Sequence, residues 1–188
     1  GLRHILVRHE QAAAHAADGY ARASGRPGVC VATSGPGATN LITGIATAQM
    51  DSSPLVAITG QVPRAMIGRD AFQETDVVGI TLPITKHSVV VEDVTELAAK
   101  VREAFTIATE GRPGPVLIDI PKDVQNQKLE WGAGSAARRP GGSAARPSMG
   151  DDNDLDTALG TAVRMLAGAR RPLLMVGHGV ILSRAYDE

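Results

Sequence analysis

The chain has 188 residues and a formal net charge of −1, from 19 Lys and Arg against 20 Asp and Glu. A charge so near zero argues against a nucleic-acid partner, because a dedicated nucleic-acid binder shows a strongly basic face. No apolar run reaches the ~18–20 residues that cross a bilayer, and 43% hydrophobic residues are enough to build a core. The single cysteine excludes an internal disulfide and a cysteine-based zinc site. These numbers favour a cytoplasmic, soluble protein, and the start at Gly1, without Met, suggests a piece of a longer chain.

The N-terminal quarter predicts a strand followed by a helix. Residues 5–7 are a short apolar run that ends at charged residues, so we expect a strand there. Residues 11–23 are rich in Ala and predict a helix, which Gly and Pro end at residues 24–28. Helical spacing puts four residues on roughly one face of this helix: Ala13, Ala16, Ala17 and Tyr20.

A second alternation of strand and helix follows. The continuous apolar run at 29–33 predicts a buried strand, and Gly and Pro at 34–37 predict a tight turn. Residues 38–49 predict a helix, and residues 55–59 predict a further strand. Strands that are apolar at consecutive positions are typical of a parallel sheet covered by helices on both faces.

The centre of the chain is less regular. Residues 61–80 are rich in Pro, Gly and charge, and we interpret them as a functional loop. A strand at 88–91, an amphipathic helix at 94–110 and a last strand at 115–120 follow. Residues 1 to about 123 therefore predict one layered α/β unit.

The C-terminal third predicts a linker and the start of another domain. Residues 129–150 are mostly small residues with Gly, Pro and Arg, without an apolar period, which is typical of a linker. Residues 151–188 predict a helix at 154–168 and a strand at 173–176. Because one helix and one strand cannot bury their own apolar faces, we interpret this part as the beginning of a truncated, Rossmann-like second α/β domain.

Two positions could carry chemistry. Glu10 follows a predicted strand and starts a helix, at the strand end where open α/β sheets bind ligands; the helix dipole alone would also favour an acid there. Residues 34–40 open a helix with glycines that let a ligand approach the backbone, although a plain turn would have the same residues. The five histidines lack metal-ligand spacing and Cys30 lies in a predicted strand, so we expect no metal site and an inert thiol.

Six blocks of sequence occur in order along the chain and carry a resemblance to a known family: Val7–Ala12, Ala32–Asn40, Ala57–Pro63, Ile67–Glu74, Ile84–His87 and Gly111–Val124. Together they resemble the pyrimidine-binding domain of thiamine-diphosphate enzymes. Within these enzymes they are similar to the large catalytic subunits of the acetolactate synthase (acetohydroxyacid synthase) family. The resemblance covers residues 1–128, resumes at 170–183, and implies a pyrimidine-domain fold that lacks its first strand.

The resemblance also implies an activity. Such an enzyme condenses two pyruvates, or pyruvate and 2-oxobutyrate, to a 2-acetohydroxy acid with loss of CO2, in branched-chain amino-acid biosynthesis. The reaction proceeds through the ylid of thiamine diphosphate, which accepts electrons when CO2 leaves. By this resemblance Glu10 is the catalytic residue, because the family's glutamate hydrogen-bonds N1′ of the aminopyrimidine.

Further roles follow from matched positions alone. The resemblance places Gln73 at the thiamine diphosphate, with Gly35 and Gly37 near the pyrimidine or a partner subunit. It assigns four residues to the substrate channel (Phe72, Gln73, Lys86 and Lys122) and two residues to FAD (Ser52 and Arg112). Lys86 could equally be an ordinary surface lysine, and Arg112 could instead cap the end of the preceding helix.

The resemblance extends to partners. It implies a homodimer or larger assembly with full-length chains and a possible regulatory small subunit. Mg²⁺ would be held by a pyrophosphate domain whose signature this sequence lacks, so we expect the chain alone to be inactive. Another thiamine-diphosphate decarboxylase or acetyltransferase, or a non-catalytic truncated module, are the alternatives. A generic nucleotide-binding Rossmann domain fits the strand–helix order but not the six blocks.

Overall fold

The computed structural model describes residues 2–129, 152–177, 179–183 and 185. The chain forms two compact units, Gly1–Arg138 and Arg139–Glu188, and each is described by itself. All but the first residue of the predicted linker at 129–150 lies outside the described residues.

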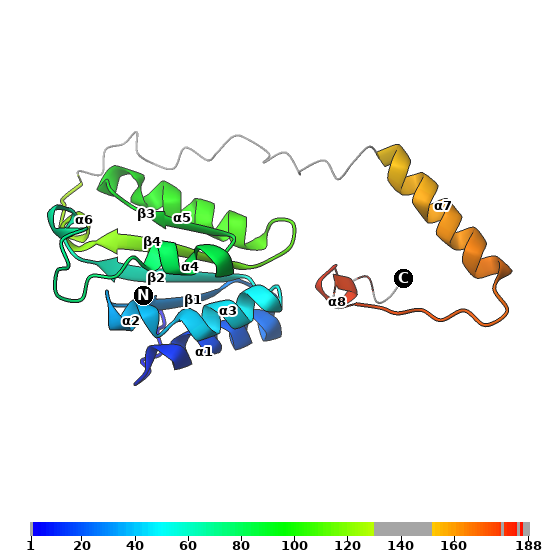
Figure 1. Cartoon of the computed structure of the whole chain (residues 1–188), viewed down its shortest axis with the longest axis horizontal. Helices are drawn as coiled ribbons and strands as arrows, with labels where there is room; N and C mark the ends of the chain where they lie inside the picture. The colour runs from blue at the N-terminus through cyan, green and yellow to red at the C-terminus, as the bar shows by residue number, and fades with distance from the viewer. Residues whose placement is uncertain (1, 130–151, 178, 184, 186–188) are drawn as a thin grey trace. The chain divides into compact units, whose positions relative to one another are not determined.

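The first unit is built on a parallel sheet of four strands in the order β1-β2-β4-β3 (Figure 1). The strands are β1 (Gly28–Ala32), β2 (Leu55–Gln61), β3 (His87–Val90) and β4 (Pro115–Pro121). Every neighbouring pair is parallel, with Leu55 opposite Gly28 on one side and opposite Pro115 on the other. The four strands predicted at 29–33, 55–59, 88–91 and 115–120 are confirmed to within two residues at each end.

Helices cover both faces of this sheet (Figure 1). On one face, α1 (Glu10–Ser24) and α3 (Ile42–Met50) pack against Leu55, Ala57 and Leu117. On the other face, α5 (Val94–Thr109) packs against Val56, Val116 and Ile118. Successive residues of β2 and β4 thus enter two different cores, which explains why both strands are apolar at consecutive positions. The short elements are α2 (Pro36–Thr39), η1 (Arg64–Met66), α4 (Val77–Thr81), η2 (Leu82–Ile84) and α6 (Lys122–Gln125).

Helix α1 confirms the helix predicted at 11–23, but its buried face is rotated from the predicted one. The residues that it buries are Ala14, Ala17, Asp18 and Ala21, whereas Tyr20 is half exposed. The cause is a close approach to neighbouring backbone. A Cβ on Gly44 would lie 2.4 Å from the Ala14 Cβ, and a Cβ on Gly28 would lie 2.0 Å from the Ala17 carbonyl oxygen. The face of α1 that packs against these two glycines is therefore its buried face.

Three expectations for the first unit are wrong. Residues 5–7 form no strand, and Ile5 and Leu6 are exposed. The reason is that a strand needs a hydrogen-bonding neighbour, and in residues 2–129 only β2 pairs with β1. The helix predicted at 38–49 is two helices, α2 and α3, which are separated at Asn40 and Leu41. The region predicted as loop at 61–80 contains η1 and α4, and Asp76 begins α4 by accepting a hydrogen bond from Gly79 N.

The second unit contains α7 (Asp152–Gly168), which confirms the helix predicted at 154–168, and α8 (Gly179–Ser183). Residues 173–176 form no strand, and their four apolar side chains are exposed. The described part of this unit contains no other strand with which they could pair. Across the described ranges, no helix combines the length and apolarity that a membrane span requires.

Candidate functional site

A cleft of about 660 Å³ lies along the carboxyl edge of the sheet. Its walls come from the ends of β1, β2 and β4 and from the segment between β2 and α4. Three of the predicted site residues line it: Phe72, Gln73 and Lys122. Phe72 is 88% exposed at this edge, which leaves an aromatic side chain available to a ligand.

The turn after β1 has a conformation that requires glycine. Gly35 has φ 60° and ψ −121°, outside the regions that L side chains adopt. A Cβ there would lie 2.7 Å from the carbonyl oxygen of Gln73. The turn therefore packs directly against Gln73, and the absence of a side chain at Gly35 lets the two backbone segments meet.

Glu10 lies beside the same turn, at its far end. Its Oε2 accepts a hydrogen bond of 2.9 Å from Asn40 Nδ2, and a Cβ on Gly37 would lie 3.5 Å from its Oε1. The hydrogen bond from Asn40 is the main reason that the pKa of Glu10 lies below its ordinary value, with a smaller contribution from His9. Glu10 is not among the residues that line the 660 Å³ cleft.

Lys86 lies at the opposite edge of the sheet, before β3. Its Nζ donates to the carbonyl oxygen of Glu110 at 2.6 Å and also to that of Ile107. Both carbonyls belong to the C-terminal end of α5, where the last carbonyls of a helix have no partner within the helix. Partial burial lowers the pKa of the Lys86 ammonium. Lys86 is therefore a helix cap at the amino edge, away from the cleft that holds Phe72 and Gln73.

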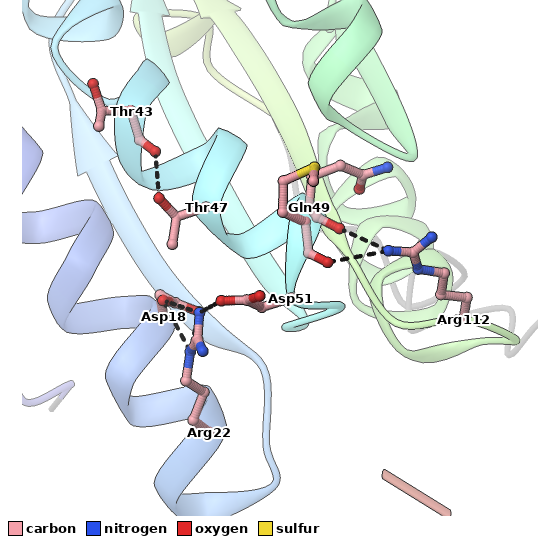
Figure 2. Close-up of polar contacts among 8 residues, drawn as sticks. Asp18, Arg22, Thr43, Thr47, Gln49, Asp51 and Arg112 are labelled. Carbon is pink, nitrogen blue, oxygen red and sulfur yellow. Dashed lines mark hydrogen bonds and ion pairs between the residues drawn. The ribbon is translucent and has the colours of Figure 1, made fainter. Parts of the chain in front are cut away.

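The two residues predicted to contact FAD lie together at the same amino edge. Arg112 Nε donates to Ser52 Oγ at 2.7 Å. Arg112 Nη2 donates to the carbonyl oxygens of Gln49 and Met50 at 3.3 and 3.2 Å (Figure 2). Arg112 does cap a helix, but it caps α3 and not the preceding helix, α5. Ser52 holds the left-handed conformation, with φ 58°, in the turn between α3 and β2.

A second arginine ties α1 to the C-terminal end of α3 (Figure 2). Arg22 Nη2 lies 2.8 Å from Asp18 Oδ2 and 2.7 Å from Asp51 Oδ2. These two carboxylates raise the pKa of the guanidinium further above its ordinary value. Asp18 is buried on α1, so Arg22 pairs a charge that would otherwise be costly to bury.

The structure gives contacts to two polar residues, Asp119 and Asn40, for which the sequence predicted no role. Asp119 in β4 is 1% exposed, and its carboxylate accepts from Thr59 Oγ1 at 2.7 Å and from Gln61 Nε2 at 2.9 Å. Burial raises the pKa of Asp119 to about 6. The feature of the sequence that could have indicated a role for Asp119 is its position as an acidic residue within an otherwise apolar strand. Asn40 was missed in a similar way, since it lies in a quoted block but its contact with Glu10 joins residues 30 positions apart.

Metal-ligating residues do not cluster in the described ranges, where no group of three or more His, Cys, Asp or Glu residues could hold an ion. Cys30 is buried in β1, and burial raises the pKa of its thiol to about 12. The thiol therefore stays protonated and unreactive, as predicted.

Residues 1–80 match the family model of the N-terminal TPP-binding domain of thiamine pyrophosphate enzymes. The matched segment contains Glu10, the glycine turn and Gln73, and its known relatives match the rest of the chain as well. Over residues 1–80 the chain is therefore similar to the thiamine pyrophosphate enzymes.

Three proteins to which the chain is similar are acetolactate synthases. The chain is 58% identical over 187 residues to the acetolactate synthase large subunit of Parasynechococcus marenigrum, covering 100% of this chain and 30% of the relative. It is 55% identical over 190 residues to the acetolactate synthase of Arthrospira platensis (100% and 32%). It is 52% identical over 182 residues to the chloroplastic acetolactate synthase of Arabidopsis thaliana (97% and 27%). The chain thus spans about a third of the length of these relatives.

Proposed function

We propose that this chain supplies the pyrimidine side of the thiamine-diphosphate site of an acetolactate synthase large subunit. The whole enzyme would condense two pyruvates, or pyruvate and 2-oxobutyrate, to a 2-acetohydroxy acid with loss of CO2. The observation that carries the proposal is Glu10, an ionised carboxylate held by Asn40 beside a glycine turn at the carboxyl edge of a parallel sheet. This is the sheet edge at which α/β folds bind cofactors.

The residues around Glu10 fit an aminopyrimidine ring. A side chain at Gly37 would come within 3.5 Å of Glu10 Oε1, so glycine keeps one carboxylate oxygen accessible while Asn40 holds the other. Glu10 would accept a hydrogen bond from the ring nitrogen N1′, and its negative charge would favour the protonated ring. When bound, thiamine diphosphate would supply the electron sink for decarboxylation and for forming the new carbon–carbon bond.

The cleft next to the turn fits small 2-oxo acids. Gln73 lies against Gly35 and lines the cleft, so it would contact the substrate, and the resemblance places it at the cofactor as well. Lys122 would attract the carboxylate of the substrate, and Phe72 would cover its apolar part. The resemblance also assigns Lys86 to the substrate channel, but both carbonyls at the end of α5 already occupy its ammonium group; a structural role is the one that its contacts support.

The remaining proposals rest on the resemblance. Ser52 and Arg112 would contact FAD at the amino edge, beyond the contacts that Arg112 Nε and Nη2 already make. Mg²⁺ would come with a pyrophosphate domain of the assembled enzyme, which would be a homodimer or larger and could carry a regulatory small subunit. A cytoplasmic location remains a proposal from composition.

A chimaera tests the proposed function directly. The chain would replace its aligned segment in the P. marenigrum relative, and acetolactate formation would be measured from pyruvate with thiamine diphosphate, Mg²⁺ and FAD. We expect an active chimaera in which Glu10→Gln lowers kcat/KM at least ~100-fold, a loss of about 2.7 kcal/mol in transition-state stabilisation. The matched control is Glu96→Gln, because Glu96 is also an acid in the first turn of a helix but lies on α5; it should retain full activity.

Two results would contradict the proposal. An active chimaera that tolerates Glu10→Gln would remove Glu10 from the chemistry. Release of acetaldehyde from pyruvate, without acetolactate, would instead support the decarboxylase alternative.

A further inference from the structure

The segment between β2 and α4 carries Phe72 and Gln73 to the cleft with little regular structure of its own. It contains only the 3₁₀ turn η1 before α4 begins at Val77. Three of its residues have positive φ: Gly68, Asp70 and Gln73. A segment with so few ladder hydrogen bonds needs side-chain contacts to fix its position.

One set of contacts shapes this segment but does not attach it to the sheet. The Glu74 carboxylate accepts from Ala71 N at 2.8 Å and from Gly68 N. These bonds close residues 68–74 into a turn and hold the pKa of Glu74 below its ordinary value. They would stay intact if the whole turn moved away from the cleft.

Gln61 provides an attachment to the sheet. It is the last residue of β2 and is 8% exposed. Its Nε2 donates to the carbonyl oxygen of Thr75 at 2.8 Å and to Asp119 Oδ2 at 2.9 Å, while its Oε1 accepts from Val62 N at 2.9 Å. Both amide N–H groups and the carbonyl oxygen are thus hydrogen-bonded. The orientation of the amide is fixed, because the Thr75 carbonyl can only accept a hydrogen bond and the Val62 N–H can only donate one.

Asp119 is an expensive residue to bury at this place. Gln61 and Asp119 line a cavity of about 290 Å³ together with Glu74 and Asp76, and no Lys, Arg or His is among its described lining residues. Thr59 and Gln61 from β2 donate to the carboxylate, and Val90 lies opposite it in β3. Burial, and to a lesser extent Asp76, therefore favour the protonated carboxyl and raise its pKa to about 6, against the ordinary 3.8.

We propose that Gln61 and Asp119 are a positioning pair that anchors residues 67–76 over the cavity and so holds Phe72 and Gln73 at the cleft. The anchor is tightest when Asp119 is neutral. A protonated Asp119 can donate to Thr59 Oγ1 and still accept from Gln61, so the hydrogen-bond set survives protonation. An ionised Asp119 is instead stabilised by hydration when the segment moves away from the sheet, so ionisation favours opening. The effect of the anchor on catalysis rests on the proposed function, whereas the anchor itself rests on the hydrogen bonds of Gln61.

Hydrogen exchange of the 188-residue chain tests the anchor without any cofactor. Gln61→Leu removes both donated bonds, so amides at 68–76 should exchange at least ~10-fold faster while those of β2 and β4 keep their protection. The matched control is Thr59→Val, since the Thr59 side chain donates its hydrogen bond to Asp119 and not to the 67–76 segment. At pH 5, where Asp119 is mostly neutral, it should leave exchange at 68–76 unchanged. Equal exchange at 68–76 in Gln61→Leu and the parent would overturn the proposal, as would equal acceleration throughout the sheet.

The pH dependence gives a second readout that does not depend on Gln61→Leu folding. If opening restores the ordinary pKa of Asp119, the opening equilibrium of 67–76 rises about tenfold between pH 5 and pH 7.5, after correction for intrinsic exchange. Asp119→Asn keeps the hydrogen bonds of the neutral form and should abolish this rise. A parent chain whose corrected exchange at 68–76 is the same at both pH values would refute the coupling to Asp119. Because these measurements contain no cofactor, their failure would leave the chimaera result standing, and an inactive chimaera would leave the anchor standing.

Discussion

The amino and carboxyl edges of the sheet use charged residues in opposite ways. At the amino edge, Lys86 and Arg112 direct their donors at the last carbonyls of α5 and α3. At the carboxyl edge, Glu10 lies at the start of α1 beside a glycine turn, and Lys122 lines an open cleft. A cation at the first edge therefore stabilises the fold, whereas a charge at the second remains available to a ligand.

The difference follows from the direction of the helices. In a parallel sheet each connecting helix runs back against the strands, so helix C-termini gather at the amino edge and N-termini at the carboxyl edge. Unsatisfied carbonyls and the negative dipole ends attract cations to the amino edge. N–H groups and the positive dipole ends make the carboxyl edge suitable for anionic groups such as the carboxylate of a substrate.

Asp119→Asn should have the largest effect on stability. It tests whether a buried carboxylate at the carboxyl edge lowers the free energy of unfolding. The folded chain raises the pKa of Asp119, so the stability that comes from its neutral form is complete below pH 3.8 and is lost as the pH rises through about 6. We expect the asparagine variant to gain up to roughly 3 kcal/mol in unfolding free energy at pH 7.5 and about half of that at pH 5. Urea unfolding at both pH values measures this gain, and a variant less stable than the parent at pH 7.5 would contradict it.

Gly35→Ala and Gly111→Ala compare the two edges at matched glycines. Both glycines have positive φ, 60° and 56°, but only Gly35 has a neighbour in the way, whereas a Cβ on Gly111 meets nothing within 4 Å. Alanine should cost about 1 kcal/mol at Gly111 for the left-handed backbone, and about 2–3 kcal/mol at Gly35, where Gln73 must also move. Equal losses in chemical denaturation would show that Gln73 does not rest against the turn.

Lys86→Met and Lys122→Met should separate a structural lysine from a ligand-facing one. Lys86→Met removes two hydrogen bonds to carbonyls at the end of α5 and should lower the unfolding free energy by about 1–2 kcal/mol. Lys122→Met should change it by less than about 0.5 kcal/mol, but should raise the KM for pyruvate in the chimaera. Thermal unfolding with steady-state kinetics distinguishes them, and a Lys122 variant with an unchanged KM would remove this lysine from the cleft's function.

The sequence predicts the sheet well because its strands are apolar on both faces. The same reasoning fails at residues 5–7 and 173–176, since apolar residues do not show whether a neighbouring strand exists to pair with them. The edge on which a residue lies was also predictable: Lys86 precedes a strand, whereas Lys122 follows one. The contact of Gln61 with Asp119 joins residues 58 positions apart, so no local pattern could indicate it.

Hydrogen exchange of the chimaera, with and without thiamine diphosphate and Mg²⁺, tests most directly whether the carboxyl edge is the cofactor site. FAD would be present throughout, so that only one ligand changes. We predict stronger protection of residues 34–40 and 68–76 when thiamine diphosphate binds, and no change at residues 49–54 and 110–114 of the amino edge. Protection confined to the amino edge would contradict this assignment and would indicate that the cofactor binds near Lys86 and Arg112.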